Sequence, residues 1–223
     1  MAFLAGKPAL VIFDCDGVLV DSEPIFLRVL HRHLIKAGAS LTHTECCAAF
    51  IGKSKTDVET YLLSQALPIP ADWPEAFYSE AMVELERDCV AVDGIAEVLH
   101  ALTSSGIPIC VASNGLRDKI EITLSCTGLL PFFEGRIHSA YEVGRSKPAP
   151  DVFLHAAEFH GAAPEHCLVV EDSPSGVEAA QAAGMGCFAY TAASALPPGR
   201  LFGAQPFTAM AQLPGLLGLE LRG

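Results

Sequence analysis

The chain has 223 residues, of which 51% are hydrophobic and 18% charged, and this balance excludes an intrinsically disordered protein. Its length allows one full-sized domain and a second, smaller one. Twenty-six acidic and 14 basic residues give a formal net charge of −12, which argues against a nucleic-acid-binding protein, because such proteins neutralise phosphates with Lys and Arg.

Short apolar runs predict the strands of a mainly parallel sheet. Residues 9–13 form a continuous apolar run that ends at Asp14, as expected of a strand buried on both faces. Similar runs predict further strands at residues 107–112, 136–139, 167–170 and 186–190. Helical patterns between them predict one helix that begins near Ile95 and three further helices, at residues 116–126, 150–160 and 174–183. This alternation predicts an α/β fold, a Rossmann-like core with a parallel sheet.

One connection is much longer than the others. Residues 22–90 contain helical patterns but no strand-like run, although βα loops usually have about 2–6 residues. We therefore expect an α-helical domain at 22–90, inserted into a catalytic core formed by 1–21 and 91–223.

Polar residues follow three of the predicted strands. Because ligands bind at the carboxyl ends of the strands in open α/β sheets, we expect these side chains to share one site. A lysine in a Ser-Lys-Pro-Ala-Pro-Asp segment, where a loop opens a helix, is a further candidate. The residues are Asp14, Asp16, Ser113, Asn114, Lys147, Glu171 and Asp172.

This set of residue types is suited to phosphoryl transfer. Crowded carboxylates need a cation, and an all-oxygen ligand set with few protein ligands fits Mg²⁺. One aspartate can then attack phosphorus, and a second can exchange a proton with the ester oxygen. Ser113, Lys147 and nearby backbone amides could hold the other phosphate oxygens.

Four motifs, in order along the chain, resemble those of the haloacid-dehalogenase-like superfamily. The resemblance extends from about residue 9 to about residue 215. The first motif is Asp-Cys-Asp-Gly-Val-Leu-Val-Asp-Ser-Glu at 14–23, and the second is Ser-Asn-Gly at 113–115. The third is Lys-Pro-Ala-Pro-Asp at 147–151, and the fourth is Glu-Asp-Ser-Pro-Ser-Gly at 171–176.

The resemblance implies a role for each matching residue. Asp14 corresponds to the nucleophile that becomes phosphorylated, and Asp16 to the general acid/base, whose backbone carbonyl is a metal ligand. Asp172 corresponds to the other Mg²⁺ ligand from the protein, with Glu171 as a direct or outer ligand. Ser113 and Lys147 correspond to the phosphate-holding pair.

The resemblance also suggests how the substrate is bound. It implies that Asn114 and Gly115 contribute to substrate binding, and that the insert at 22–90 is a helical cap that closes over the site. In the cap, Lys55 belongs to a basic segment at 52–55 and could reach the non-reacting part of the substrate. An alternative for this segment is an ordinary solvated helix start, because Ser54 could be an N-cap.

We expect a phosphatase that acts on a small phosphorylated metabolite, with a sugar or sugar-acid phosphate as first choice. The presence of Asp16 disfavours dehalogenation. A β-phosphoglucomutase is the nearest alternative, but that family has a histidine where this chain has Phe26, and Ser-Ala-Ser where it has 113–115. A phosphate-binding module without turnover is a further alternative, disfavoured by the intact Asp16.

Other features indicate where the protein works. The first 13 residues lack a basic region and a cleavage site, so no signal peptide is expected, and the uncharged stretch 179–199 is broken by glycine and proline. Eight cysteines without a CxxC pair favour reduced thiols, and the eight histidines show no metal-ligand spacing. We expect a cytoplasmic monomer or weak dimer without a membrane or nucleic-acid partner.

Overall fold

The computed structural model describes residues 7–51, 55–192, 196 and 198–219. The chain divides into two compact units: a core, which contains the residues up to Asp21 and those from Val90 onward, and a helical unit, Ser22–Cys89. The boundary lies one residue before the expected one, because Val90 pairs with Asp21 in a short antiparallel ladder of β2 (Val20–Asp21) and β3 (Val90–Ala91).

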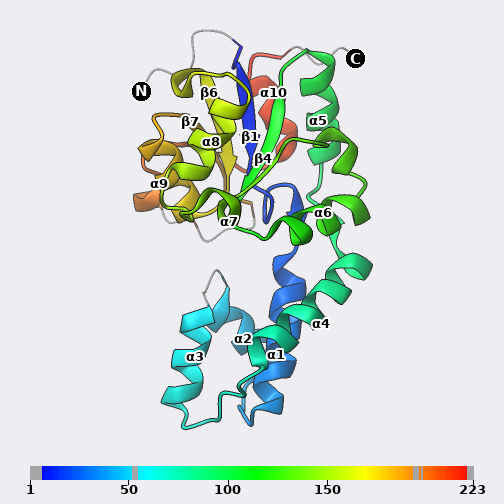
Figure 1. Ribbon diagram of the computed structural model, residues 1–223, viewed down its shortest axis with the longest axis vertical. Coiled ribbons are helices and arrows are strands. Elements are labelled where there is room, and N and C mark those ends of the chain that lie inside the picture. Colours follow the sequence, from blue (N-terminus) through cyan, green and yellow to red (C-terminus); the bar gives the residue numbers. More distant parts are fainter. Residues whose placement is uncertain (1–6, 52–54, 193–195, 197, 220–223) are drawn as a thin grey trace. The chain divides into compact units, whose positions relative to one another are not determined.

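The core is built on a six-stranded sheet with the strand order β5-β4-β1-β6-β7-β8 (Figure 1). All neighbouring strands in this sheet are parallel, so the α/β prediction is confirmed. The strands are β1 (Leu10–Phe13), β4 (Ile109–Ser113), β5 (Ile137–Ser139), β6 (Cys167–Glu171), β7 (Gly186–Tyr190) and β8 (Gln205–Phe207).

Helices connect these strands and cover the sheet. They are α5 (Ile95–Ser104), α6 (Arg117–Cys126), α7 (Ala140–Val143), α8 (Asp151–Phe159), α9 (Pro174–Ala182) and α10 (Leu213–Leu216). Helices α8 and α9 pack on one face of the sheet, where their apolar residues join Leu10, Ile12 and Cys110 in a buried cluster. On the other face, Phe13 meets Phe133 edge to face, with ring centroids 6.4 Å apart.

The five strands and four core helices expected from the sequence are all present, with ends shifted by one or two residues at most of them. The strand β8 and the β2–β3 ladder were not predicted. Each has only two or three residues, too few to show a periodic pattern, and Pro206 inside β8 is unfavourable in a strand except at an edge. The position of β8 at the edge of the sheet, next to β7, explains why this proline is accepted.

The described residues of the helical unit form four helices with their own apolar core. They are α1 (Glu23–Lys36), α2 (His43–Phe50), α3 (Lys55–Ser64) and α4 (Trp73–Asp88). Thr42 and Glu45 form a capping box at the start of α2, which satisfies backbone N–H groups that would lack partners there. Leu30, Leu34 and Trp73 are among the buried residues that hold the helices together.

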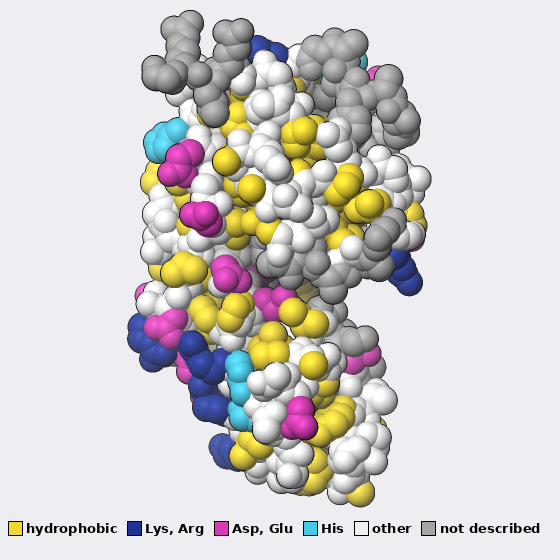
Figure 2. All heavy atoms as spheres, turned by 180° about the vertical axis from the view of Figure 1, so that it is seen from behind, with side chains coloured by type: hydrophobic (Ala, Val, Ile, Leu, Met, Phe, Trp, Pro, Cys, Tyr) yellow, Lys and Arg dark blue, Asp and Glu magenta, His cyan; other side chains and the backbone are white. Residues whose placement is uncertain are grey.

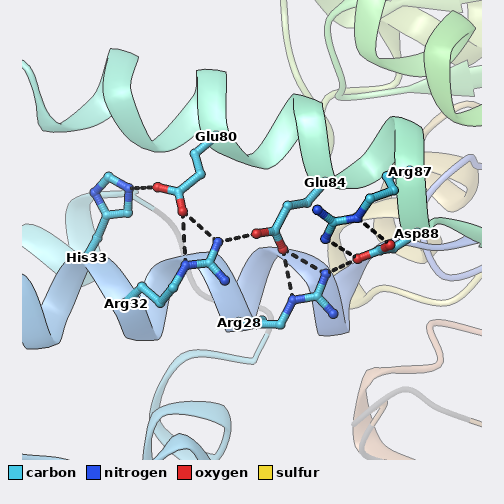
Figure 3. Close-up of polar contacts among 7 residues, drawn as sticks. All are labelled: Arg28, Arg32, His33, Glu80, Glu84, Arg87 and Asp88. Atoms are coloured by element: carbon cyan, nitrogen blue, oxygen red, sulfur yellow. Dashed lines mark hydrogen bonds and ion pairs between the residues drawn. The ribbon is translucent and has the colours of Figure 1, made fainter.

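A row of ion pairs joins α1 to α4 (Figure 3). Arg28 donates through Nε to Glu84 at 2.8 Å, and Arg32 also pairs with Glu84. Arg32 and His33 further contact Glu80, with His33 Nε2 2.9 Å from the carboxylate. Basic side chains gather on this side of the helical unit, as Figure 2 shows. Glu84 thus bridges two arginines of α1 and fixes the register of the two helices.

None of the helices among the described residues combines the length and the apolar character that a membrane crossing requires. All eight cysteines are free thiols.

Candidate active site

The strand order places three of the sequence motifs side by side. Strand β1 lies between β4 and β6, and Phe13 at its end pairs with Val111 on one side and with Val170 on the other. The residues that follow these strands therefore meet at one edge of the sheet. Asp14 follows β1, Ser113 ends β4 and Glu171 ends β6.

Lys147 lies between two carboxylates at this edge. Its Nζ donates to Asp14 Oδ1 at 2.6 Å and to Glu171 Oε1 at 2.8 Å, and its side chain is 2% exposed. The ammonium also lies over the ring of Phe153, 4.7 Å from the centroid. Burial alone would lower the pKa of Lys147, but the charges of Asp14 and Glu171 raise it above its ordinary value, so this lysine stays charged.

Glu171 is held on both of its oxygens. Oε1 accepts from Lys147, and Oε2 accepts from the backbone N–H of Asp172 and of Ser173 at 2.8 Å and from the Ser173 hydroxyl at 2.9 Å. The start of α9 is so close that a Cβ at Gly176 would lie 1.7 Å from Oε1. Such a carboxylate is better suited to fixing Lys147 and the Asp172 backbone than to ligating a metal directly.

Asp14, Glu171 and Asp172 form a compact group whose carboxylate oxygens lie within 4.8 Å of one another. Burial, together with the charges of Glu171 and Asp16, raises the pKa of Asp14 to about 7 despite the opposing effect of Lys147. Burial and the charges of Glu171 and Asp14 raise the pKa of Asp172 well above its ordinary value. A divalent cation would relieve this crowding, and the all-oxygen set fits Mg²⁺.

The loop after β1 approaches Asp172 closely. Gly17 has φ +76°, and a Cβ there would lie 2.1 Å from Asp172 Oδ2. Only glycine accepts both this backbone conformation and this contact, so Gly17 allows the Asp16 backbone and the Asp172 carboxylate to face one region.

Asp16 is paired with Lys119, a lysine that belongs to none of the four sequence motifs. Lys119 Nζ donates to Asp16 Oδ1, and the lysine side chain is 6% exposed, whereas that of Asp16 is 35% exposed. The sequence did carry a signal, because residues 119, 120, 123 and 124 share one face of α6 and the other three are Ile, Thr and Leu. A lysine on such a buried face needs an acidic partner.

The second motif positions the third. The Asn114 side chain accepts from the Lys147 backbone N–H at 2.9 Å and donates to the Lys147 carbonyl at 3.4 Å. Ser113 is 2% exposed, and its hydroxyl accepts from the Gly115 N–H at 3.0 Å. The Asn114 side chain thus orients the segment that carries Lys147. The Gly115 carbonyl accepts from the Ser139 hydroxyl at 2.6 Å, so both backbone groups of Gly115 are hydrogen-bonded within the core. The expected contribution of Asn114 and Gly115 to substrate binding stays a prediction.

Lys55 belongs to the helical unit, where it is the first residue of α3. Its side chain lies outside the described residues, so its expected contact with substrate stays a prediction.

Comparison with known proteins places these motifs in context. A family model described as haloacid dehalogenase-like hydrolase matches residues 8–184. The 6-phosphogluconate phosphatase of Escherichia coli K12 is 31% identical over 208 residues, which cover 92% of this chain and 93% of that protein.

Two solved structures are similar to nearly the whole length of the chain. A hydrolase of the same family from Deinococcus radiodurans R1, with bound phosphate and sodium, has 31% identity and a TM-score of 0.84, covering 98% of this chain and 100% of that one. A conserved haloacid dehalogenase-like protein of unknown function from Agrobacterium tumefaciens C58 has 35% identity and a TM-score of 0.82, covering 94% and 97%.

Proposed function

Because the chain belongs to the haloacid dehalogenase-like hydrolase family and to the phosphoric monoester hydrolases, we propose that it hydrolyses a sugar or sugar-acid phosphate. The proposed reaction uses Mg²⁺ and proceeds through an aspartyl-phosphate intermediate. The observation that carries this proposal is the buried group of Asp14, Glu171 and Asp172 with Lys147 between two of them. The substrate class is supported by the similarity of this chain to the 6-phosphogluconate phosphatase of Escherichia coli.

In the first step, a carboxylate oxygen of Asp14 attacks phosphorus and the bond to the ester oxygen breaks. Asp16, two residues along the chain, gives its proton to the leaving oxygen. In the second step, water attacks the phosphoryl group, Asp16 takes up the proton, and phosphate is released as Asp14 is restored.

The other residues hold the reacting groups in place. Lys147 keeps the Asp14 carboxylate oriented and, with Ser113 and neighbouring backbone N–H groups, stabilises the charge on the phosphoryl oxygens. Asp14, Asp172 and the Asp16 carbonyl would hold Mg²⁺, with Glu171 outside them. The metal, when bound, supplies positive charge against the carboxylates and the phosphate. Lys119 orients Asp16 for proton transfer.

The helical unit is assigned the role of a cap that selects the substrate, with Lys55 as a candidate contact. The mutase alternative is disfavoured by Phe26, whose ring packs against that of Phe77 with centroids 6.0 Å apart. A phenylalanine at this position offers no group that could exchange a proton with a sugar hydroxyl.

The test is phosphate release from p-nitrophenyl phosphate and from a panel of phosphorylated sugars and sugar acids, with and without Mg²⁺. Asp14→Asn should abolish release, whereas Asp118→Asn, an exposed aspartate on α6, should not change it. Release by the Asp14→Asn variant at the wild-type rate would refute the aspartyl-phosphate mechanism. Conversion of β-glucose 1-phosphate into glucose 6-phosphate without free phosphate would favour the mutase instead.

A further inference from the structure

A second cluster of potential ligands lies beneath α8, outside the carboxylate group. It consists of Cys110 on β4, His138 on β5 and His160 at the C-terminal end of α8. His138 pairs with Ala112 across the two parallel strands, and Cys110 is two residues before Ala112, so both side chains point to the face that α8 covers. His160 joins them where α8 ends.

The three residues are close enough to share one ion. One ring nitrogen of each histidine and the Cys110 sulfur lie within 4.8 Å of one another. In a zinc site, bond lengths of about 2.0–2.3 Å place ligand atoms about 3.3–3.8 Å apart. Side-chain rotations that move each atom by about 1 Å or less would therefore complete the geometry.

Each of the two histidines also has a buried ring nitrogen without a hydrogen-bond partner among the described residues. In both His138 and His160 this nitrogen is Nε2. His138 is 4% exposed and Cys110 is fully buried. Buried polar groups are normally hydrogen-bonded, because leaving one unsatisfied is costly, so two unsatisfied imidazoles side by side indicate that something else binds them.

We propose that Cys110, His138 and His160 form a binding site for a transition-metal ion that takes nitrogen and sulfur ligands, with Zn²⁺ as the best match. A thiolate and two imidazoles suit this class of ion, whereas Mg²⁺ and Ca²⁺ prefer oxygen. Binding forms one metal–sulfur and two metal–nitrogen bonds and releases the Cys110 thiol proton to solvent.

The surroundings are compatible with this site. Burial, followed by the nearby charges of His155 and His160, lowers the pKa of His138 to about 4, so its imidazole is neutral and can ligate. The ring of exposed His155 packs against the His138 ring with centroids 5.3 Å apart, and the ring of Phe159, which is 61% exposed, does so with centroids 5.1 Å apart. His155 and Phe159 are thus exposed residues that lie beside the cluster.

The site is separate from the phosphatase chemistry. Cys110 lies three residues before Ser113, about 10 Å along the strand. A bound ion would link β4, β5 and α8, and α8 follows directly on the segment that carries Lys147. We therefore expect binding to stabilise this part of the core rather than to take part in catalysis.

The experiment uses the full chain, stripped with a chelator and dialysed into excess Mg²⁺. Titration with Co²⁺ should give one equivalent of binding and a thiolate-to-cobalt charge-transfer band, and Zn²⁺ should displace the cobalt. Cys110→Ala should abolish the band, and His160→Ala should weaken Zn²⁺ binding by more than about 100-fold. His155→Ala, a neighbouring histidine outside the set, is the matched control and should bind like the wild type.

Several results would overturn the proposal. They are the absence of a thiolate band in the wild type, Zn²⁺ affinity unchanged in His160→Ala, or equal loss in His155→Ala. If Cys110→Ala does not fold, the Zn²⁺ affinity of His160→Ala decides the question. This variant should fold, because His160 is a half-buried residue at a helix end, and circular dichroism checks that it does. Phosphate release with Mg²⁺ should be the same in His160→Ala as in the wild type, which separates this site from the proposed function.

Discussion

The contact between Lys119 and Asp16 predicts a defect that is specific to proton transfer. Lys119→Met keeps the length and the apolar stem of a side chain that is 6% exposed, but removes its ammonium from Asp16. A hydrogen bond to a charged group contributes about 1.5–3 kcal/mol. If this energy orients Asp16 in the transition state, its loss lowers kcat about 10- to 150-fold, since about 1.4 kcal/mol corresponds to a factor of ten.

Steady-state kinetics on two kinds of substrate tests this prediction. The loss of kcat should be larger for an alkyl phosphate than for p-nitrophenyl phosphate, because the poorer leaving group depends more on the proton from Asp16. KM should stay near the wild-type value, since Lys119 acts through Asp16. Arg117→Met is the matched control, because it removes a cation from the same helix. The ion-pair partners of Arg117 are Glu142 and Glu121 rather than Asp16.

A double-mutant cycle provides the decisive result. In an Asp16→Asn background, Lys119→Met should cost little further activity, because the group that it orients is already gone. Two independent losses that multiply in the double variant, or wild-type kcat in Lys119→Met, would refute the reasoning.

Three further predictions concern Gly176, Glu84 and the dependence on metal. Gly176→Ala should lower both the free energy of unfolding and kcat, because its Cβ would lie 1.7 Å from Glu171 Oε1; thermal melting and turnover measure this. Glu84→Gln should lower the stability of the helical unit by about 1–2 kcal/mol at pH 7, a modest value because Arg28 and Arg32 are 42% and 40% exposed. Although burial opposes it, hydrogen bonds from both arginines lower the pKa of Glu84, so its contribution is present above the ordinary glutamate pKa and fades as the pH falls below it. Denaturation can be followed by the fluorescence of the single tryptophan, which lies in α4. The free energies of unfolding of the wild type and of Glu84→Gln should converge at acid pH. Finally, a chelator should abolish turnover and excess Mg²⁺ restore it, and turnover that persists after chelation would contradict metal dependence.

The sequence alone was sufficient for five of the six strands of the core sheet and for the motifs that follow them. The apolar residues 10–13 and 167–170 are buried on both faces of the sheet, so their composition predicts the strand without knowledge of its neighbours. Because the carboxyl ends of parallel strands share one edge, Asp14, Ser113 and Asp172 could be assigned to a common site from their positions in the chain.

The pairing of Lys119 with Asp16 and the convergence of Cys110, His138 and His160 required the tertiary structure. These residues are far apart in the chain and belong to elements whose contacts depend on strand register and on how α6 and α8 pack. The histidines have no metal-ligand spacing, since β4, β5 and α8 each supply a single residue to the cluster. A local pattern predicts which face of an element is buried, but only the packing of elements determines which side chain it meets there.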